Sequence, residues 1–354
     1  MPSLTETAIV ARKVIKYTLI GLVAIIIMVP LGRAFKNYWA KTHPAPPPPP
    51  TMDFGALPPI NFGPSQSEKF TKLSYRLETP DNTLPNLGTQ APVYFIATLG
   101  PKFFDEEKTR EKARAINFLY PPQKTKPTEF SFLNPETKAV LKIDTINNNF
   151  EFRYPYQADP TITRLPAPSK QRALSASLSF LKKMKQDTSD LDAENPQYVF
   201  LRYRPEERDL VTAPSLSEGQ FTKVILYRKN IDGLPILPPN NNGPNIFLIV
   251  SGATESEKKI VFARYIHFPI DYQRRATYPI KSTATAWEEL KAGKGYIENF
   301  GNNNPQEPIV IRKIYLAFFD PDTPQNFLQP IFVFEGDNNF RAYIPAVSAS
   351  SIKG

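Results

Sequence analysis

An uncharged apolar run near the N-terminus constrains the architecture of this chain more than any other feature. Residues 14–31 read VIKYTLIGLVAIIIMVPL, and no charge occurs between Tyr17 and Gly32. In an α-helix this run would extend about 27 Å, which matches the hydrocarbon core of a bilayer. We therefore predict a transmembrane helix from Val14 to Phe35, preceded by a cytoplasmic stub at residues 1–13.

The charges beside the predicted span do not decide its orientation, because three basic residues lie on each side. Long domains are translocated largely regardless of flanking charge. We therefore expect a single-pass protein of the cell membrane with a cytoplasmic N-terminus and an extracytoplasmic C-terminal region. A cleaved signal peptide is one alternative, although Arg33-Ala34-Phe35-Lys36 is a poor cleavage site. A buried core helix is another, and the proline tract that follows argues against it.

Most of the net positive charge lies beside the span. The chain has a net charge of +9, and residues 1–41 contribute +5 through six basic residues and Glu6. The rest of the chain holds 37 of the 43 basic residues and 33 of the 34 acidic residues, so it is nearly balanced. This distribution suits anionic lipid headgroups, and no basic stripe indicates nucleic-acid binding. We predict the lipid bilayer as a partner and no nucleic acid.

A proline tract follows the span. Residues 44–50 read PAPPPPP, which is typical of a polyproline II spacer. We predict a stalk over residues 36–67 that lifts the remaining chain off the membrane. A proline-rich ligand for a partner protein is the alternative.

Beyond the stalk, a helix followed by several strands recurs three times. Helical patterns occur at 104–119, 169–184 and 283–290, and Ser169 is a plausible N-cap for the second. Apolar or alternating runs bounded by Asn, Gly and Pro follow each helix and predict antiparallel strands, among them 129–133, 197–204, 246–251, 309–319 and 341–345. We predict an α+β fold of tandem modules, each with one helix packed on an antiparallel meander. The expected boundaries are 68–168, 169–280 and 281–348, with a tail at 349–354.

One segment resembles a known family. Residues 227–236 read YRKNIDGLPI, in which Asp232-Gly233 would make a tight turn before Pro235. This pattern resembles the hairpin of PepSY-like modules. Further segments look like the closing half of YycI/YycH-type membrane-anchored regulators, and the resemblance covers about residues 170–347. The segments that look like YycI/YycH-type proteins begin at Ala286 (AWEELKAG), Ile311 (IRKIYLAF), Leu328 (LQPIFVF) and Ala342 (AYIPA). The resemblance implies a regulatory ectodomain acting on a membrane partner such as a sensor kinase or a protease.

Few residues offer catalytic chemistry. Cysteine is absent, which excludes disulfides and thiol nucleophiles and favours a bacterial or archaeal surface for an exported protein. Of the two histidines, His43 lies in the stalk and His267 is expected to be half-buried at a strand end. One histidine in the folded region and no cysteine leave too few ligands for a typical zinc site and argue against a Ser-His-Asp triad. Asp320 and Asp322 form the best carboxylate pair, although an Asx-turn loop is the simpler explanation and the one we favour. We predict no enzymatic activity, no cofactor and no metal, and keep a divergent hydrolase using these two aspartates as a minor alternative.

The predicted hairpin at 226–236 suggests where a partner would bind. An exposed hairpin edge would present Tyr227, Arg228, Asn230 and Asp232 for β-augmentation by a partner strand. We therefore predict a non-enzymatic binding or regulatory role with a membrane or envelope protein as partner. An ordinary internal hairpin remains an alternative for this segment. A second candidate function is a cell-envelope module that binds polysaccharide or peptidoglycan through aromatic side chains.

Overall fold

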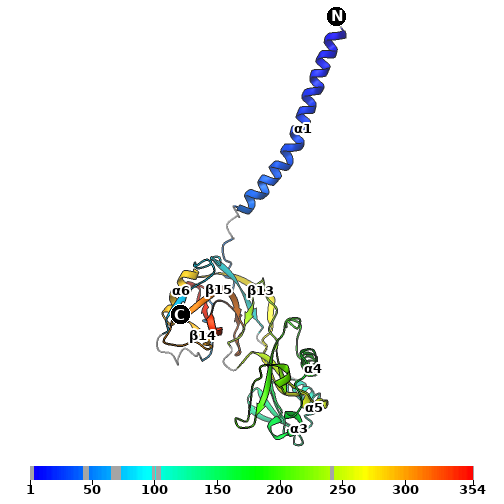
Figure 1. The fold of residues 1–354 in the computed structure, drawn as a ribbon, viewed down its shortest axis with the longest axis vertical. Coiled ribbons are helices and arrows are strands. Elements are labelled where there is room, and N and C mark those ends of the chain that lie inside the picture. Colours follow the sequence, from blue (N-terminus) through cyan, green and yellow to red (C-terminus); the bar gives the residue numbers. More distant parts are fainter. Residues whose placement is uncertain are drawn as a thin grey trace. The chain divides into compact units, whose positions relative to one another are not determined.

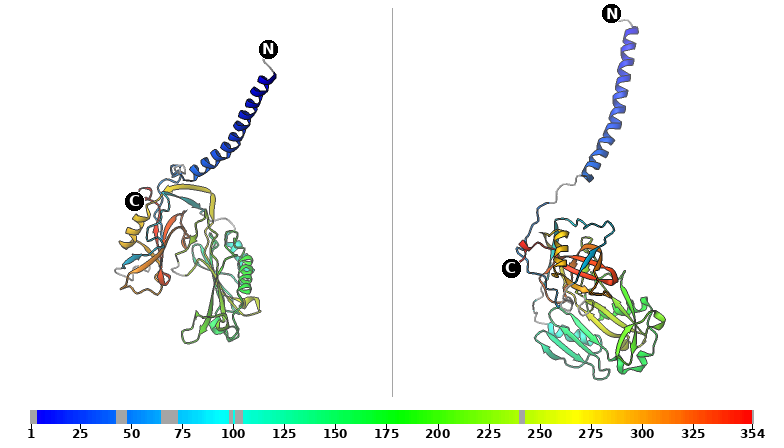
Figure 2. Two further views of the ribbon diagram at one scale, coloured as in Figure 1. Left: turned by 45° about the horizontal axis from the view of Figure 1, so that its top comes forward. Right: turned by 60° about the vertical axis from the view of Figure 1, so that its left-hand side comes forward.

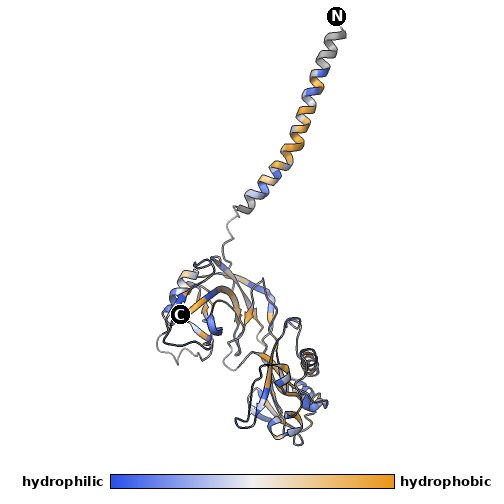
Figure 3. Ribbon diagram, viewed as in Figure 1, coloured by the Kyte–Doolittle hydropathy of each residue, from blue (hydrophilic) through white to orange (hydrophobic). Residues whose placement is uncertain are grey.

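The computed structural model describes residues 4–42, 48–64, 73–97, 100, 105–239 and 243–353. The chain divides into two compact units, Met1–Pro49 and Pro50–Gly354. The described part of the first unit is dominated by helix α1 (Leu4–Thr42), whose segment Val14–Trp39 is long and apolar enough to cross a membrane (Figure 1). Apolar residues dominate the middle of this helix (Figure 3). The predicted apolar helix is therefore present.

The second unit is a mixed α+β fold of mostly antiparallel sheets with few helices, as predicted at that level. Its largest sheet has nine antiparallel strands. In spatial order these are β3 (Gln123–Lys126), β4 (Glu129–Leu133), β5 (Val140–Asp144), β6 (Phe150–Arg153), β12 (Ile260–Tyr265), β11 (Ile246–Ser251), β9 (Phe221–Ile225), β7 (Gln197–Arg204) and β8 (Asp209–Thr212).

Two smaller sheets complete this unit. The six-stranded sheet contains β1 (Tyr75–Leu77), β15 (Ile309–Phe319), β17 (Pro330–Gly336), β18 (Arg341–Pro345) and β14 (Tyr296–Asn299), with β10 (Ile236–Leu237) also paired to β15. The three-stranded sheet contains β13 (Ile270–Pro279), β2 (Gln90–Ile96) and β16 (Phe327–Leu328). Strands β1 and β10 pair with β15 in parallel, and the other pairs within these two sheets are antiparallel.

The helices of this unit are short except for α4. They are α2 (Asp105–Arg114), α3 (Pro160–Thr163), α4 (Lys170–Lys183), α5 (Ser256–Lys259) and α6 (Thr283–Lys291), with single 3-10 turns at Tyr156–Ala158, Leu216–Glu218, Asp337–Asn339 and Ala349–Ser351. The predicted N-cap is confirmed, since the Ser169 hydroxyl accepts a hydrogen bond from the Arg172 N–H at 3.4 Å. Helix α4 packs on one face of the nine-stranded sheet through buried residues such as Leu181 (Figure 2).

Helix α2 ends earlier than the predicted 104–119. Asn117 has a positive φ of 68°, and the Phe118 N–H donates to the Ala113 carbonyl at 3.0 Å while the Asn117 N–H donates to Arg114 at 3.0 Å. This is the hydrogen-bond pattern of a Schellman C-cap. It turns the buried Phe118 back toward the sheet, where its ring lies edge-on to Phe152. Phe118 therefore belongs to the cap and the core, while Leu119 beyond it is exposed.

The predicted tandem modules are not confirmed as separate meanders. Strand β6, from the first predicted module, pairs with β12, from the second, through Phe150↔Tyr265 and Phe152↔Ala263. These residues are buried in one core beneath α4. Most strands of the first two predicted modules therefore form a single sheet, while β1, β2, β10 and β13 belong to the two smaller sheets.

Part of the predicted stalk also belongs to the second unit. Most of the proline tract and residues 65–72 lie outside the described residues. Residues 50–64 pack on the sheets instead of forming a spacer. Leu57 is fully buried and bridges to Ile352, and Phe62 stacks on Tyr296 at 5.0 Å between ring centroids. The apolar side chains in this Pro-rich segment supply the reason, because they can leave water only by packing on the sheets.

Candidate functional site

The segment predicted as an exposed hairpin is a crossover between two sheets. The predicted turn is present, with φ of 51° at Asp232 and 77° at Gly233 and a bridge between Ile231 and Leu234. After this turn the chain enters β10, which pairs in parallel with β15 of the six-stranded sheet. The segment therefore offers no hairpin edge for β-augmentation, and that part of the prediction is wrong.

Arg228 cannot contact a partner directly, because its side chain is only 2% exposed. Its guanidinium pairs with Asp190 at 2.6 Å and Asp320 at 3.2 Å, and it donates to the Phe268 carbonyl at 3.1 Å. The other predicted partner-binding residues are more accessible. Tyr227 is half-buried, while Asn230 and Asp232 are exposed.

Arg228 is the centre of a buried polar network. The His267 Nε2 lies 3.0 Å from Asp190, and the Asn245 side-chain amide donates to Asp320 at 3.0 Å. Burial raises the pKa of Asp190, but the hydrogen bond from His267 and the charge of Arg228 outweigh it and lower that pKa to about 2. Burial likewise lowers the pKa of Arg228, and the two aspartates more than reverse this. The network thus holds its charges as an ion cluster.

The network brings together three residues that the sequence had singled out separately, Arg228, His267 and Asp320. Asp190 and Asn245 were missed, since neither lies in a motif. Because Arg228 and Asn245 both contact the Asp320 carboxylate, this carboxylate serves the network. Trp287 is also buried, and its ring lies 6.1 Å from that of Phe334, measured between centroids. Arg228, His267 and Asp320 therefore stabilise the fold, as Trp287 does in the core.

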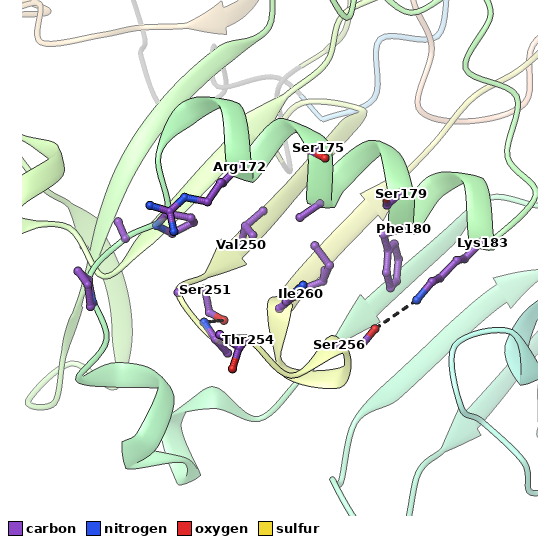
Figure 4. Close-up of a pocket in the computed structure, with 17 residues that line it drawn as sticks. Arg172, Ser175, Ser179, Phe180, Lys183, Val250, Ser251, Thr254, Ser256 and Ile260 are labelled. Carbon is purple, nitrogen blue, oxygen red and sulfur yellow. Dashed lines mark hydrogen bonds between the residues drawn. The ribbon is translucent and has the colours of Figure 1, made fainter.

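A groove beside α4 is the strongest candidate site (Figure 4). Its volume is about 580 Å³, and its walls are α4, the segment Pro166–Pro168 and the β11–β12 connection. Arg172 lies near one end of α4 and Lys183 near the other, with Phe180 pointing toward the strands between them. We call this site the α4 groove.

Local geometry explains why the groove forms. Arg172, Ser175, Ser179 and Lys183 are spaced three or four residues apart, so they share one face of the helix. The opposite wall approaches closely because Gly252 has no side chain. A Cβ at that position would lie 2.3 Å from the Pro166 carbonyl oxygen.

Hydrogen bonds hold the wall formed by Pro166–Pro168 in place. The Ala167 N–H donates to the Gly219 carbonyl at 2.9 Å, and the Thr222 hydroxyl donates to the Pro168 carbonyl at 2.7 Å. The second bond fastens the segment before α4 to β9, and the first fastens it to the turn that precedes β9. The groove is therefore part of the folded framework.

The lining of the α4 groove is cationic and rich in hydroxyls. Arg172, Lys183 and Lys259 line it, and no carboxylate does. Within the described ranges none of these three cations forms an ion pair, whereas the neighbouring Lys258 pairs with Asp159 at 3.0 Å. The hydroxyls come from Ser175, Ser179, Ser251, Thr254 and Ser256. Positive charge and hydroxyl donors together suit an anionic ligand.

The spacing of the cations favours an extended ligand. Arg172 and Lys183 are eleven residues apart, which corresponds to about 16 Å along the helix axis. The Lys183 amine donates to the Ser256 hydroxyl at 3.2 Å, so it already faces the opposite wall. A neighbouring cavity of about 290 Å³ shares Phe180, Lys183, Ser256 and Ile260 and adds one cation, Arg114, and one carboxylate, Glu257. A chain bearing several anionic groups could follow this line of cations.

Comparisons with known proteins do not identify the site. No family model matches the chain, and no curated protein matches it. One solved structure with similarity is an uncharacterized protein from Eubacterium rectale, 11% identical, with 73% of this chain and 82% of that chain covered and a TM-score of 0.39. This likeness carries no inference about function. The resemblance to PepSY-like and YycI/YycH-type proteins stays a prediction.

Proposed function

We propose that this chain is a single-pass, membrane-anchored binding protein whose extracytoplasmic region holds an extended anionic ligand in the α4 groove. The observation that carries the proposal is the lining, with three cations and no carboxylate in a groove of about 580 Å³. The apolar segment Val14–Trp39 supports the anchor. Phe180 is the one aromatic residue in the lining, which disfavours sugar recognition by ring stacking.

Recognition in the groove would be electrostatic. Arg172 presents a planar fork of donors and Lys183 a point charge, so each can hold one carboxylate or phosphate group. The serine hydroxyls between them would donate to further oxygens along the ligand. Carboxylate and phosphate polymers share this chemistry, so the test must compare both.

Binding is tested with the full chain in neutral detergent micelles, using a fluorescent hexaglutamate peptide and a short polyphosphate as probes. We expect Lys183→Met to weaken binding of the preferred probe about tenfold, the effect of one lost charge-assisted contact. Lys182→Met is the matched control, because Lys182 is exposed on the same helix but does not line the groove. Equal losses in both variants would show non-specific surface charge and contradict the proposal.

Topology is tested on intact cells. Added protease should remove the region after α1, since we place it outside the membrane. Protection of that region in intact cells, with cleavage after lysis, would contradict the extracytoplasmic location. This result is independent of ligand binding.

A further inference from the structure

The face of the nine-stranded sheet opposite α4 is a second candidate surface. Side chains alternate along each strand, so Phe150 and Phe152 of β6 lie in the core beneath α4, while Glu151 and Arg153 point to the other face. A hollow of about 1100 Å³ lies against that face. Because it is on the far side of the sheet, this hollow is distinct from the α4 groove.

Strand register places a regular row of side chains across this face. Neighbouring residues pair across β5, β6, β12, β11, β9 and β7, and we call their row the open-face row. Its members, in order, are Val140, Arg153, Phe262, Ile249, Lys223 and Val199. Two cations thus flank a central apolar pair, and apolar residues lie at both ends.

Lys223 is a half-buried cation with no carboxylate partner in the described part of the chain. Its amine lies 4.1 Å from the centre of the Phe247 ring, which stacks on Phe262 at 5.1 Å. Burial lowers the pKa of Lys223, and the nearby charge of Arg264 lowers it further. An incoming carboxylate would relieve both effects, since it would stabilise the charged amine.

Arg153, the second cation of the open-face row, can exchange its present carboxylate partner for that of a ligand. Arg153 lies over the Phe262 ring at 5.3 Å and pairs with Glu151 at 2.7 Å, yet its side chain is 66% exposed. A surface ion pair of this kind contributes little, so a partner carboxylate can share or replace it. Around the row, Lys138 and Lys142 also line the hollow, against the carboxylates of Glu151 and Asp209. The surface is therefore positively charged around an apolar centre.

We propose that the open-face row docks an extended acidic segment of a partner protein, with acidic residues at positions i and i+4 and an apolar residue at i+2. Arg153 and Lys223 are separated by three strand spacings, or about 14 Å. In an extended peptide, residues i and i+4 lie on one side and about 13 Å apart. The apolar residue between them would then rest on Phe262 and Ile249.

The test uses the full chain in neutral detergent micelles and two labelled peptides of identical composition. Ser-Glu-Ser-Phe-Ser-Glu-Ser has the proposed spacing, and Ser-Glu-Glu-Ser-Phe-Ser-Ser does not. We expect fluorescence anisotropy to show about tenfold tighter binding of the first, the effect of one charge-assisted contact. Lys223→Met should remove this preference, while Lys183→Met in the α4 groove should preserve it.

Several results would overturn the proposal. Equal binding of the two peptides would remove the spacing argument, and loss of binding only in Lys183→Met would assign the peptide to the α4 groove. Binding of a neutral oligosaccharide that Lys223→Met leaves unchanged, without peptide binding, would assign the face to sugar. Far-UV circular dichroism of each variant ensures that affinities are compared between folded proteins.

Discussion

Replacing Arg228 by Met should destabilise the second unit far more than loss of an ordinary surface ion pair. The substitution keeps an apolar stem of similar length and removes the guanidinium that Asp190 and Asp320 share. Both carboxylates then stay in the interior without their cation. His267 and Asn245 remain as single hydrogen-bond partners and compensate only in part.

The expected loss is about 3–5 kcal/mol, the usual cost of removing one partner of a buried pair. An independent figure comes from Asp190, whose pKa falls from 3.8 to about 2. That difference corresponds to about 2 kcal/mol in favour of the ionised carboxylate, after its burial is included. Losing most of this at Asp190, while the buried Asp320 carboxylate also loses its cation, agrees with a loss of several kcal/mol.

Urea unfolding of the full chain in micelles measures the effect through Trp287 fluorescence, because Trp287 is buried in the core. Trp39 in α1 is replaced by Phe in every variant, so that Trp287 is the one tryptophan left. Arg312→Met is the matched control. Arg312 also holds two carboxylates, Glu78 at 2.7 Å and Asp337 at 2.8 Å, but its side chain is 49% exposed. Its removal should cost less than about 1 kcal/mol. Equal losses in the two variants would refute the reasoning from burial.

Two further predictions follow from the described contacts. Asp190 and Asp159 both have pKa values lowered to about 2, so each stabilises the fold above about pH 4, and this contribution is lost as the pH falls toward 2. Urea titrations at pH 5 and pH 2.5 should show this loss, and an unchanged unfolding free energy would contradict it. Leu57→Ala should cost about 2–5 kcal/mol, because Leu57 is fully buried, whereas Leu119→Ala, at 65% exposure, should cost little. A loss below about 1 kcal/mol for Leu57→Ala would indicate that residues 50–64 do not pack on the sheets and belong to the predicted stalk.

Local patterns predicted many single elements of this fold. The predicted strands at 129–133, 197–204, 246–251, 309–319 and 341–345 have the bounds found for β4, β7, β11, β15 and β18. Strand β13 was missed, because its centre reads DYQRR and its residues 272–275 are exposed. A polar stretch of this kind lacks the apolar alternation of a half-buried strand, and its pairing with β2 is interrupted by an irregularity between Asp271 and Arg275.

The candidate site was harder to predict from local sequence patterns than the single strands and helices. The face of α4 that carries Arg172 and Lys183 follows helical spacing and could be listed from the sequence. Its surroundings could not, since the opposite wall comes from residues 250–260, and only the tertiary fold brings them together. The same limit applies to Arg228, which follows β9 on the chain and reads as a strand-end cation. Its burial depends on Asp190 and Asp320, which lie 38 and 92 residues away.

Both proposed surfaces depend on the pairing that the predicted modules would have excluded. The open-face row crosses β6 and β12 side by side, so it exists only when strands from before and after α4 share one sheet. The α4 groove needs the same sheet, because the β11–β12 connection forms its second wall and α4 packs on a core that includes β6. The chain between β6 and β12 is long, and closing such a loop costs entropy that only extensive burial offsets. The buried side chains of Phe150, Phe152, Ala263 and Tyr265, on the face beneath α4, provide that burial. The pairing of β6 with β12 therefore supports both proposed surfaces, and a ligand on either face of the sheet would stabilise that pairing.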